Sequence, residues 1–432
     1  MSQYTDIFPD YEILLLKLLK YSINIDIPPE SLLEPNDRKQ YFDSIISSHF
    51  EKDELDNADW KTVVNMADRH SVLPLLYDTM SGISSLPKPI FNMTANKTKQ
   101  TVLQNYRLLA LSDRLISQLE NSGIHAVLLK GWQTAVAYPV PETRKSGDID
   151  ILVADNKEFI RAVSTFEQLG YKKAADQLTI HHIEFKTESG ISIELHSMLS
   201  EPFENELINR RINDILPEYL CNITHHKILG YTIACTDESH DAFYLLLHML
   251  QHFLRAGFGL KLLCDWCVFW KRDIDKKQKT DFLRLIRHCR MENFAKAITR
   301  LCIIYLGLSF EKVEFLFKED DKTLILSPKY QNIEGLMKDI LEAEEFGHSS
   351  SDRMVLLHGS RPSDYFREFH HQMKLSHKRA SKYIILWPCL WLDTLIVFLH
   401  NNKHIRKTTV KEIFRKAGMR SRIIKEIKLF ER

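Results

Sequence analysis

The chain has 432 residues, of which 44% are hydrophobic and 27% charged; this is ordinary globular composition and excludes a disordered or low-complexity chain. The formal net charge is +1, so overall charge attracts neither nucleic acid nor membrane, and electrostatic recognition has to be local. Seven irregularly spaced cysteines form no disulfide framework, and the N-terminus lacks a signal-peptide pattern, so we expect a cytoplasmic protein.

Helical periodicity dominates the first part of the chain, and residues 11–115 are predicted to be helical. A segment of mixed character follows. It is predicted to contain a strand at 124–131, a short helix at 132–139, a strand at 148–154, a helix at 156–171 and a β-hairpin formed by 181–187 and 191–199.

From about residue 204 onward the pattern is helical again. Residues 345–380 are polar and weakly patterned, which indicates loops, and the apolar stretch 383–400, interrupted by Pro388 and Asp393, favours a pair of core helices over a membrane span. The predicted class is α+β, a small mixed sheet flanked by N-terminal and C-terminal helical regions. The expected domains are a helical region (1–115), the sheet core (116–203), a helical domain (204–345) and a C-terminal loop with a basic helical tail (346–432).

Two carboxylates stand out in the segment RKSGDIDILV, residues 144–153. Side chains alternate along a strand, so Asp148 and Asp150 point to one face while Ile149 and Ile151 point to the other. Two neighbouring carboxylates repel each other, and a divalent cation removes that conflict. Mg²⁺ binds through one or two carboxylates together with substrate phosphates, so the pattern indicates a metal site that awaits a phosphate ligand.

Glu194 in the segment ISIELH is a third acid within an apolar strand. If its strand lies beside the strand of Asp148 and Asp150, three carboxylates meet. Such a cluster can hold two Mg²⁺ ions, with Mn²⁺ as an alternative, and these would stabilise the attacking and leaving oxygens of a phosphoryl displacement.

A phosphate-binding turn is predicted upstream of the acids. Lys130 and Gly131 join the strand of 124–131 to the following helix, where a charge and a closely approaching backbone suit an anion. Arg144, Ser146 and Gly147, just before the acids, add further donors for a triphosphate.

Together these segments resemble the DNA polymerase β-like nucleotidyltransferase superfamily, in which a Gly-Ser turn precedes a helix, an acid-x-acid strand follows and a third acid lies on a later strand. More narrowly, LLKGWQTAVAYP, RKSGDIDILV and IELH resemble the bacterial uncharacterised nucleotidyltransferase family, as do the flanking helical segments. Lys130-Gly131 replaces Gly-Ser, so that turn lacks the hydroxyl expected to touch the triphosphate. The identity of the nucleotide or donor therefore stays open.

The resemblance implies a metal-dependent transferase that moves a nucleotidyl group from an NTP to an acceptor such as a small molecule, saccharide or peptide. Asp148, Asp150 and Glu194 would be the catalytic metal ligands, and Glu194 would help to deprotonate the acceptor. Two alternatives remain open: transfer of another group, such as a sugar, from a metal-bound nucleotide donor, and a non-catalytic nucleotide-binding scaffold. The near-neutral charge disfavours nucleic acid as the acceptor.

Three further residues are candidates for substrate contact or support of the site. His196 shares the face of Glu194; His248 is spaced four residues from His252 on a helix, which favours packing near the site; Asp265 lies in an apolar helix. Cys264 and Cys267 have redox or zinc spacing but no second pair, which favours buried helical thiols. The tail 401–432 carries eleven Lys and Arg against three Asp and Glu, a pattern that allows peripheral membrane contact.

Overall fold

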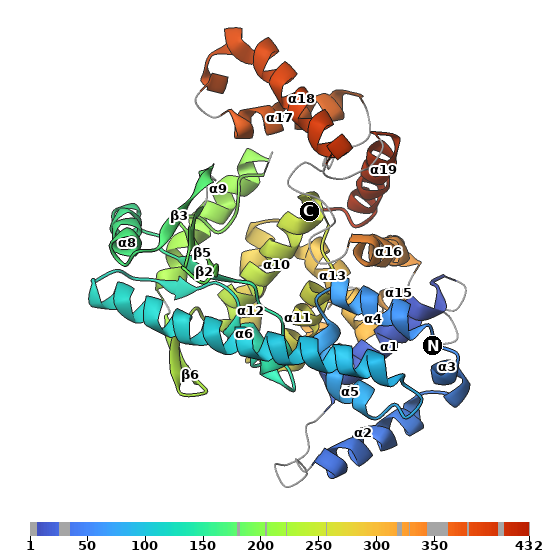
Figure 1. Cartoon of the computed structure of the whole chain (residues 1–432). Helices are drawn as coiled ribbons and strands as arrows, with labels where there is room; N and C mark the ends of the chain where they lie inside the picture. Colours follow the sequence, from blue (N-terminus) through green and yellow to red (C-terminus); the bar gives the residue numbers. More distant parts are fainter. Residues whose placement is uncertain are drawn as a thin grey trace.

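The structure is a computed structural model. It describes residues 7–25, 35–178, 182–203, 205–221, 223–255, 257–317, 322–327, 329–343, 362–377, 380–404 and 410–431. It confirms the α+β class, with a mixed sheet surrounded by helices (Figure 1).

The sheet has seven strands in the order β3-β4-β5-β2-β1-β7-β6. The strands are β1 (Val127–Leu128), β2 (Asp148–Leu152), β3 (Lys172–Leu178), β4 (His182–Lys186), β5 (Ser192–His196), β6 (Thr224–Ile228) and β7 (Tyr231–Cys235). β2 runs parallel to β5, and β1 runs parallel to β7, whereas the other neighbours are antiparallel. The predicted hairpin is confirmed as β4 and β5.

Helices precede and follow the sheet segment. The N-terminal part contains α1 (Asp10–Asn24), α2 (Pro35–His49), α3 (Lys52–Asp56), α4 (Trp60–Arg69), α5 (Tyr77–Ser81) and α6 (Lys88–Asn121). Within the sheet segment lie α7 (Trp132–Ala135), α8 (Asn156–Gln168) and α9 (Glu206–Ile215). The rest comprises α10 (Glu238–Arg255), α11 (Leu260–Lys271), α12 (Lys276–His288), α13 (Glu292–Leu306), α14 (Phe310–Val313), α15 (Lys322–Ile325), α16 (Ile333–Ala343), α17 (Pro362–Ser376), α18 (Trp387–His404) and α19 (Val410–Glu426).

The two faces of the sheet have different neighbours. Ile149 and Ile151 of β2 join one apolar cluster with side chains of α6 and α8, including Leu115 and Phe166, so these two helices cover one face (Figure 1). Leu152, which points the other way, belongs to a second cluster that contains α10. The alternation predicted from the sequence is therefore confirmed, and the acids of β2 face α10 rather than α6.

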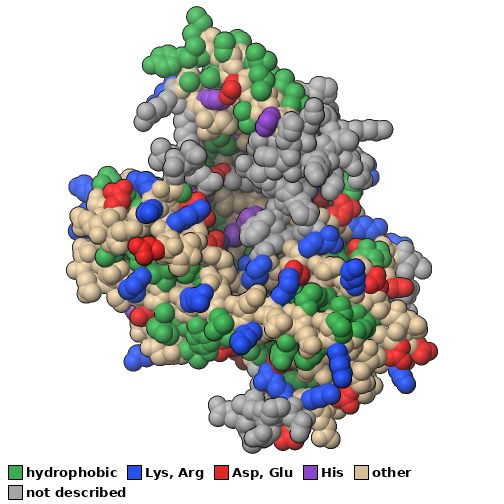
Figure 2. Space-filling view, in the orientation of Figure 1, with side chains coloured by type: hydrophobic (Ala, Val, Ile, Leu, Met, Phe, Trp, Pro, Cys, Tyr) green, Lys and Arg blue, Asp and Glu red, His purple; other side chains and the backbone are tan. Residues whose placement is uncertain are grey.

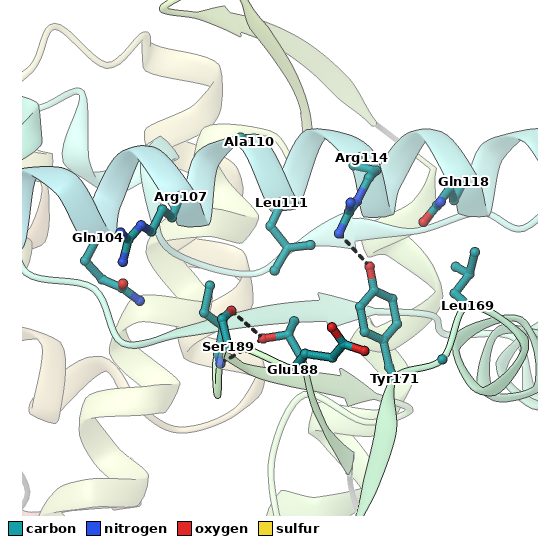
Figure 3. A pocket seen from close by; sticks show the side chains of 13 residues that line it. Gln104, Arg107, Ala110, Leu111, Arg114, Gln118, Leu169, Tyr171, Glu188 and Ser189 are labelled. Carbon is teal, nitrogen blue, oxygen red and sulfur yellow. Dashed lines mark hydrogen bonds between the residues drawn. The ribbon is translucent and has the colours of Figure 1, made fainter.

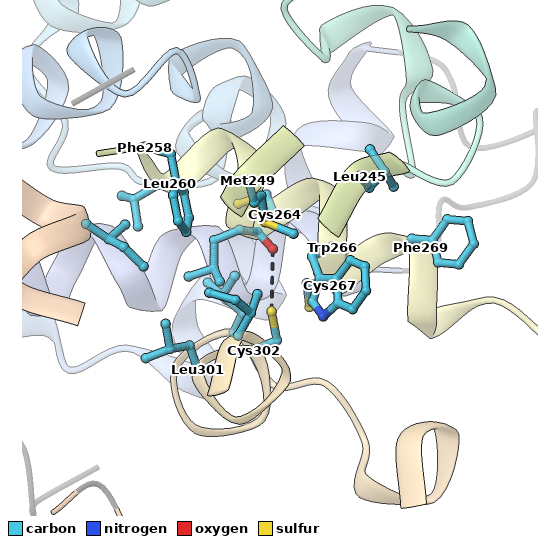
Figure 4. Packing of buried hydrophobic residues seen from close by; sticks show 14 of the residues in the cluster. Leu245, Met249, Phe258, Leu260, Cys264, Trp266, Cys267, Phe269, Leu301 and Cys302 are labelled. Carbon is cyan, nitrogen blue, oxygen red and sulfur yellow. Dashed lines mark hydrogen bonds between the residues drawn. The ribbon is translucent and has the colours of Figure 1, made fainter. Parts of the chain in front are cut away.

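The larger apolar core joins the helices that follow the sheet to N-terminal helices such as α1 and α4. Figure 4 shows side chains of α10, α11 and α13 packed together, with Trp266 and Cys302 among them. Cys264 and Cys267 are buried free thiols in this core, which confirms that their spacing reflects helix packing. This core anchors α10 and α11, the helices that supply one wall of the site.

Two strand regions were not expected. Residues 224–235 were predicted to be helical, but they form the hairpin of β6 and β7, and β3 was not predicted. Four of the five β6 residues are exposed because this strand lies at the edge of the sheet, so the sequence lacks the apolar alternation by which strands are recognised. The sheet consequently extends beyond the predicted core of 116–203.

The C-terminal part also departs from the prediction. Residues 362–376, expected as loop, form α17, and residues 344–361 lie outside the described residues. The stretch 383–400 is not a pair of core helices: it forms a short 3-10 turn and α18, and Ile385 is 87% exposed. Apolar sequence identified a helix but not its burial. Among the described residues no helix is long and apolar enough to cross a membrane.

Candidate active site

Strand register brings the predicted acids together. In the parallel pairing of β2 with β5, Asp150 lies beside Glu194, and in the antiparallel pairing of β5 with β4, Glu194 lies beside Glu184. Since alternate residues share a face, Asp148 lies on the same face as these three. The strand of Glu194 therefore neighbours β2, as the predicted meeting of three carboxylates requires.

The three predicted metal ligands converge. One carboxylate oxygen from each of Asp148, Asp150 and Glu194 lies within 4.8 Å of the others, and we call these residues the carboxylate cluster. The side chain of Asp150 is 1% exposed, that of Glu194 26% and that of Asp148 35%. The cluster therefore runs from a buried floor at Asp150 to an open rim at Asp148, where a ligand can enter.

Lys130 lies beside the same carboxylates. Its Nζ is 3.1 Å from Asp150 Oδ2 and 3.5 Å from Asp148 Oδ2. Burial by itself lowers the pKa of Lys130, but the charges of Asp148 and Asp150 outweigh burial and raise this pKa well above its ordinary value. Lys130 is therefore a permanent positive charge at the site.

Gly131 opens α7 as predicted, with φ of 107°. Only glycine adopts this backbone conformation without strain, so the turn after β1 requires it. The turn directs Lys130 back toward β2 while α7 leads away. Helix α7 is only four residues long. The predicted phosphate-binding turn therefore consists mainly of Lys130 and the backbone of Gly131.

The carboxylate cluster fits a cation on structural grounds. Among the described residues, Asp150 Oδ2 is buried without a hydrogen-bond partner, since Lys130 Nζ approaches it at ion-pair distance but outside hydrogen-bond geometry. A buried carboxylate oxygen that accepts no hydrogen bond is costly. Three oxygen donors of this type match the ligands that Mg²⁺ prefers.

His196 is held by two of the acids. Its Nε2 is 3.1 Å from Asp150 Oδ1 and 3.3 Å from Glu194 Oε2. Burial lowers the pKa of His196, yet the hydrogen bonds to Asp150 and Glu194 raise it to about 9. For Glu194, burial raises the pKa, while His196 and Lys130 lower it more, so Glu194 is ionised at neutral pH. His196 therefore lies within the site, as the sequence suggested.

Arg144 has a different environment from the one expected. Its Nε and Nη2 donate to Asp265 Oδ1 and Oδ2 at 2.7 and 2.8 Å, and its Nη1 donates to Ser146 Oγ at 2.9 Å. All three nitrogens of this buried guanidinium are engaged. Tyr138 also donates to Asp265 Oδ1, at 2.7 Å. In this structure Arg144 and Asp265 hold the segment before β2, and Ser146 is the member of this network nearest to the acids in sequence.

Gly147 is exposed, and an added Cβ would meet nothing within 4 Å. Packing therefore does not require glycine there. The open space leaves the backbone ahead of Asp148 accessible, in keeping with the predicted donor segment.

Helix α10 forms the wall opposite the sheet. Tyr244, His248 and His252 recur every four residues, and His248 Nε2 is 2.9 Å from His252 Nε2. Burial and then the charge of Lys130 lower the pKa of His252 to about 4 and that of His248 well below its ordinary value. The pair is neutral at physiological pH. Sequence spacing had indicated packing near the site, and Tyr244 was missed although it continues the same polar stripe.

His182 was also missed. It begins β4 and is the register partner of His196. The signal was available in the predicted hairpin, because residues equidistant from its turn face each other.

Figure 2 shows the surface hollowed beneath α17 and α18, with histidine side chains visible in the hollow.

A separate groove of about 950 Å³ lies between α6 and the turn joining β4 to β5. Figure 3 shows Arg107 and Arg114 of α6 on one side and Glu188 on the other. None of the carboxylate cluster lines it, because the cluster is on the opposite face of the sheet. Its size therefore says nothing about the chemistry of the acids.

Residues 56–307 match a family described as uncharacterised nucleotidyltransferases, and this match covers more than half of the chain. The chain belongs to that family. The family segment contains the whole sheet, the carboxylate cluster and α10, whereas α17, α18 and α19 lie beyond it.

Structural comparison finds a weak likeness. The crystal structure of an antigenic nucleotidyltransferase-like protein from Paracoccidioides brasiliensis is 14% identical, with a TM-score of 0.28 over 42% of this chain and 87% of that chain. No match was found among curated proteins.

Proposed function

We propose that the protein is a Mg²⁺-dependent nucleotidyltransferase of the DNA polymerase β-like superfamily, which transfers a nucleotidyl group from an NTP to an acceptor. The observation that carries this proposal is the convergence of Asp148, Asp150 and Glu194 within 4.8 Å, inside the segment that matches the nucleotidyltransferase family. The buried Oδ2 of Asp150, which accepts no hydrogen bond, supports a cation there.

Asp148 and Asp150 would hold two Mg²⁺ ions, and Glu194 would hold the ion on the acceptor side; Mn²⁺ has compatible ligand preferences. When bound, the ions would stabilise charge on the attacking and leaving oxygens. The three carboxylates, including the buried Oδ2 of Asp150, all lie on β2 and β5, so the proposed metal site does not involve the C-terminal helices.

The chain's own groups would divide the remaining work. Lys130, beside both aspartates, would bind the triphosphate and offset its charge, with the backbone of Gly131 and the donors of Ser146 and Gly147 nearby. Glu194 would accept the proton of the acceptor hydroxyl. The acceptor oxygen then bonds to the α-phosphorus as the bond from that phosphorus to pyrophosphate breaks. Arg144 would act by holding Ser146.

The alternatives make different demands on the site. Transfer of another group, such as a sugar, from a metal-bound nucleotide donor would use the same carboxylates with a different bond broken. A non-catalytic scaffold would have no need for three converging acids, one of them, Asp150, buried, since burying a carboxylate is costly. We therefore favour an enzyme, with a small molecule, saccharide or peptide as acceptor and with nucleic acid disfavoured by the near-neutral charge.

The test is transfer of label from NTPs that carry it on the α-phosphate, with Mg²⁺ and fractionated cell extract as the source of acceptor. Transfer by the wild-type chain, lost in Asp148→Asn and retained in the matched surface variant Glu188→Gln, would support nucleotidyl transfer. Label that stays on free nucleotide, with sugar transferred from nucleotide-sugars instead, would favour the second function. Absence of both activities, with nucleotide binding retained, would favour the scaffold.

We further propose a cytoplasmic protein whose C-terminal part contacts a membrane surface. The cysteine pattern supports a reducing compartment. Figures 1 and 2 show α17 and α18 projecting from the body with apolar side chains on their surface. The exposed apolar residues of this part are Phe366, Tyr383, Ile384, Ile385, Leu386, Leu392, Leu395, Ile396, Val397 and Leu399. Cosedimentation with anionic phospholipid vesicles, reduced in Ile385→Asp, would support this contact, and equal sedimentation of both chains would contradict it.

A further inference from the structure

A second group of metal-binding side chains adjoins the carboxylate cluster. One ligand atom from each of His182, Glu194 and His196 lies within 4.8 Å of the others, and we call these residues the histidine cluster. His182 and His196 are cross-strand partners in the β4–β5 pairing, and Glu194 is two residues before His196 on the same face. The register of one hairpin therefore places all three side chains together.

The spacing of these atoms suits a shared ion. His196 Nε2 is 3.3 Å from Glu194 Oε2, and His182 Nε2 is 3.9 Å from the same oxygen. Ligands about 2.0–2.2 Å from one tetrahedral ion lie roughly 3.3 Å apart. Asp150 Oδ1 lies 3.1 Å from His196 Nε2 and so borders the histidine cluster. The separations within the cluster, all within 4.8 Å, are near those of a coordination shell.

The ligand types select the ion. The carboxylate cluster offers oxygen alone, which suits Mg²⁺. The histidine cluster offers two imidazoles and one carboxylate, and imidazole suits Zn²⁺ and other late divalent transition metals far better than Mg²⁺. The two clusters share Glu194, whose two oxygens can face two ions.

We propose that His182, Glu194 and His196 form a distinct binding position for a divalent transition-metal ion beside the magnesium-type carboxylate cluster. The position deepens the proposed function, because the shared Glu194 would couple a tightly held transition metal to the ion on the acceptor side. Its existence as a binding site does not depend on nucleotidyl transfer.

A purely structural role for the histidines makes a different prediction. His196 would then hydrogen-bond the two acids and His182 would pack against His196, with ring centroids 5.1 Å apart, and neither imidazole would bind a metal ion. In that case no added metal ion would have nitrogen ligands. Detection of nitrogen ligation therefore separates the two roles.

The experiment is Mn²⁺ binding to the full chain, with and without a large excess of Mg²⁺, combined with pulsed electron paramagnetic resonance to detect ¹⁴N coupling. We expect wild type to retain one Mn²⁺ against Mg²⁺, with coupling from two imidazole nitrogens. His182→Gln, at a half-buried position, should weaken Mn²⁺ binding more than about tenfold and leave at most one coupled nitrogen, since even outer-shell partners cost that much. His225→Gln is the matched control, because His225 lies on β6 of the same sheet and pairs with Glu120.

Wild type without ¹⁴N coupling, or His182→Gln with unchanged affinity and coupling, would overturn the inference. Asp148→Asn separates this failure from failure of the proposed function, since Asp148 belongs only to the carboxylate cluster. That variant should keep wild-type ¹⁴N coupling while losing stabilisation by Mg²⁺ and NTP. If wild type lacks the coupling but Asp148→Asn still loses the nucleotide effect, the transition-metal position falls and the nucleotidyltransferase proposal stands.

Discussion

Asp150 of β2 and Glu194 of β5 are register partners, and both carboxylates accept a hydrogen bond from the imidazole of His196, whose Nε2 lies 3.1 and 3.3 Å from their oxygens. This pairing fixes how far apart two catalytic candidates lie without any contribution from loops. The positive charges of His196 and Lys130 therefore offset part of the negative charge of the two acids, even without a metal ion. The stability of several variants depends on this compensation.

Neutralising either aspartate should abolish the reaction. Asp148→Asn and Asp150→Asn each remove a metal-binding charge, so we expect turnover to fall by about 10³-fold or more, because metal-based charge stabilisation supplies several kcal/mol of the barrier. Thermal unfolding with and without Mg²⁺ and NTP gives the binding readout: wild type and Glu188→Gln should be stabilised by the mixture, and both variants should not. Equal stabilisation of all four proteins would remove these acids from the site.

The same two variants should differ in stability without metal. Repulsion between the aspartates predicts that either change holds or raises stability, and for the 35% exposed Asp148 this stays our expectation. For Asp150 the structure leads to a different expectation, because this buried side chain is an ion-pair partner of Lys130 and His196. Asp150→Asn should lower the free energy of unfolding by about 1–3 kcal/mol in chemical denaturation. An unchanged or higher value would mean that relief of repulsion offsets the lost ion pairs.

Removing Lys130 should make stability depend on divalent cations. Lys130→Met removes the ion pairs of Lys130 with Asp148 and Asp150, so we expect a loss of about 3 kcal/mol in metal-free buffer at neutral pH. Added Mg²⁺ should then stabilise the variant more than wild type, since the ion replaces the missing charge. Denaturant titrations of both proteins with EDTA or Mg²⁺ measure this difference. Equal gains would show that Mg²⁺ does not bind beside these carboxylates.

Asp241 should make the free energy of unfolding fall as the pH rises. Burial raises its pKa to about 6 despite the hydrogen bond from Gln133 Nε2 at 2.9 Å. Between about pH 4 and 6 the folded chain holds this proton while the unfolded chain, with an ordinary pKa near 3.9, has lost it. Unfolding then releases a proton, so the free energy of unfolding falls as pH rises through this window, by up to roughly 3 kcal/mol.

Asp241→Asn removes that titration. Compared with wild type, the variant should gain stability at pH 7 and little at pH 4, as measured by urea unfolding across the window. Glu188→Gln, an exposed acid in the β4–β5 turn, controls for loss of one charge. If the difference between Asp241→Asn and wild type stays constant from pH 4 to 7, Asp241 is ionised throughout.

Arg144 and Asp265 should behave as one unit. Either Arg144→Met or Asp265→Asn leaves a buried partner unpaired and should cost about 3–5 kcal/mol, while the double variant should cost less than the sum. A double-mutant cycle by chemical denaturation gives the coupling. Additive losses would indicate that Arg144 makes its main interactions elsewhere, such as with a phosphate.

The sequence alone determined the local chemistry of the site. Alternation along 148–153 assigned the acids to one face and Ile149 and Ile151 to the core, and the glycine at 131 marked a turn that only glycine adopts. The hairpin of β4 and β5 was also predicted. These features depend on neighbours within a few residues, so the sequence pattern contains them.

Only the tertiary structure decided which distant groups meet. The register of β2 with β5 places Asp150 beside Glu194, and the register of the β4–β5 hairpin places His182 beside His196. Asp265 accepts hydrogen bonds from the guanidinium of Arg144, which is 121 residues away in the sequence. The edge position of β6 and the exposure of α18 likewise depend on what packs around them. Periodicity reports which face is apolar, whereas pairing and burial follow from contacts between segments far apart in the chain, and no local pattern specifies those.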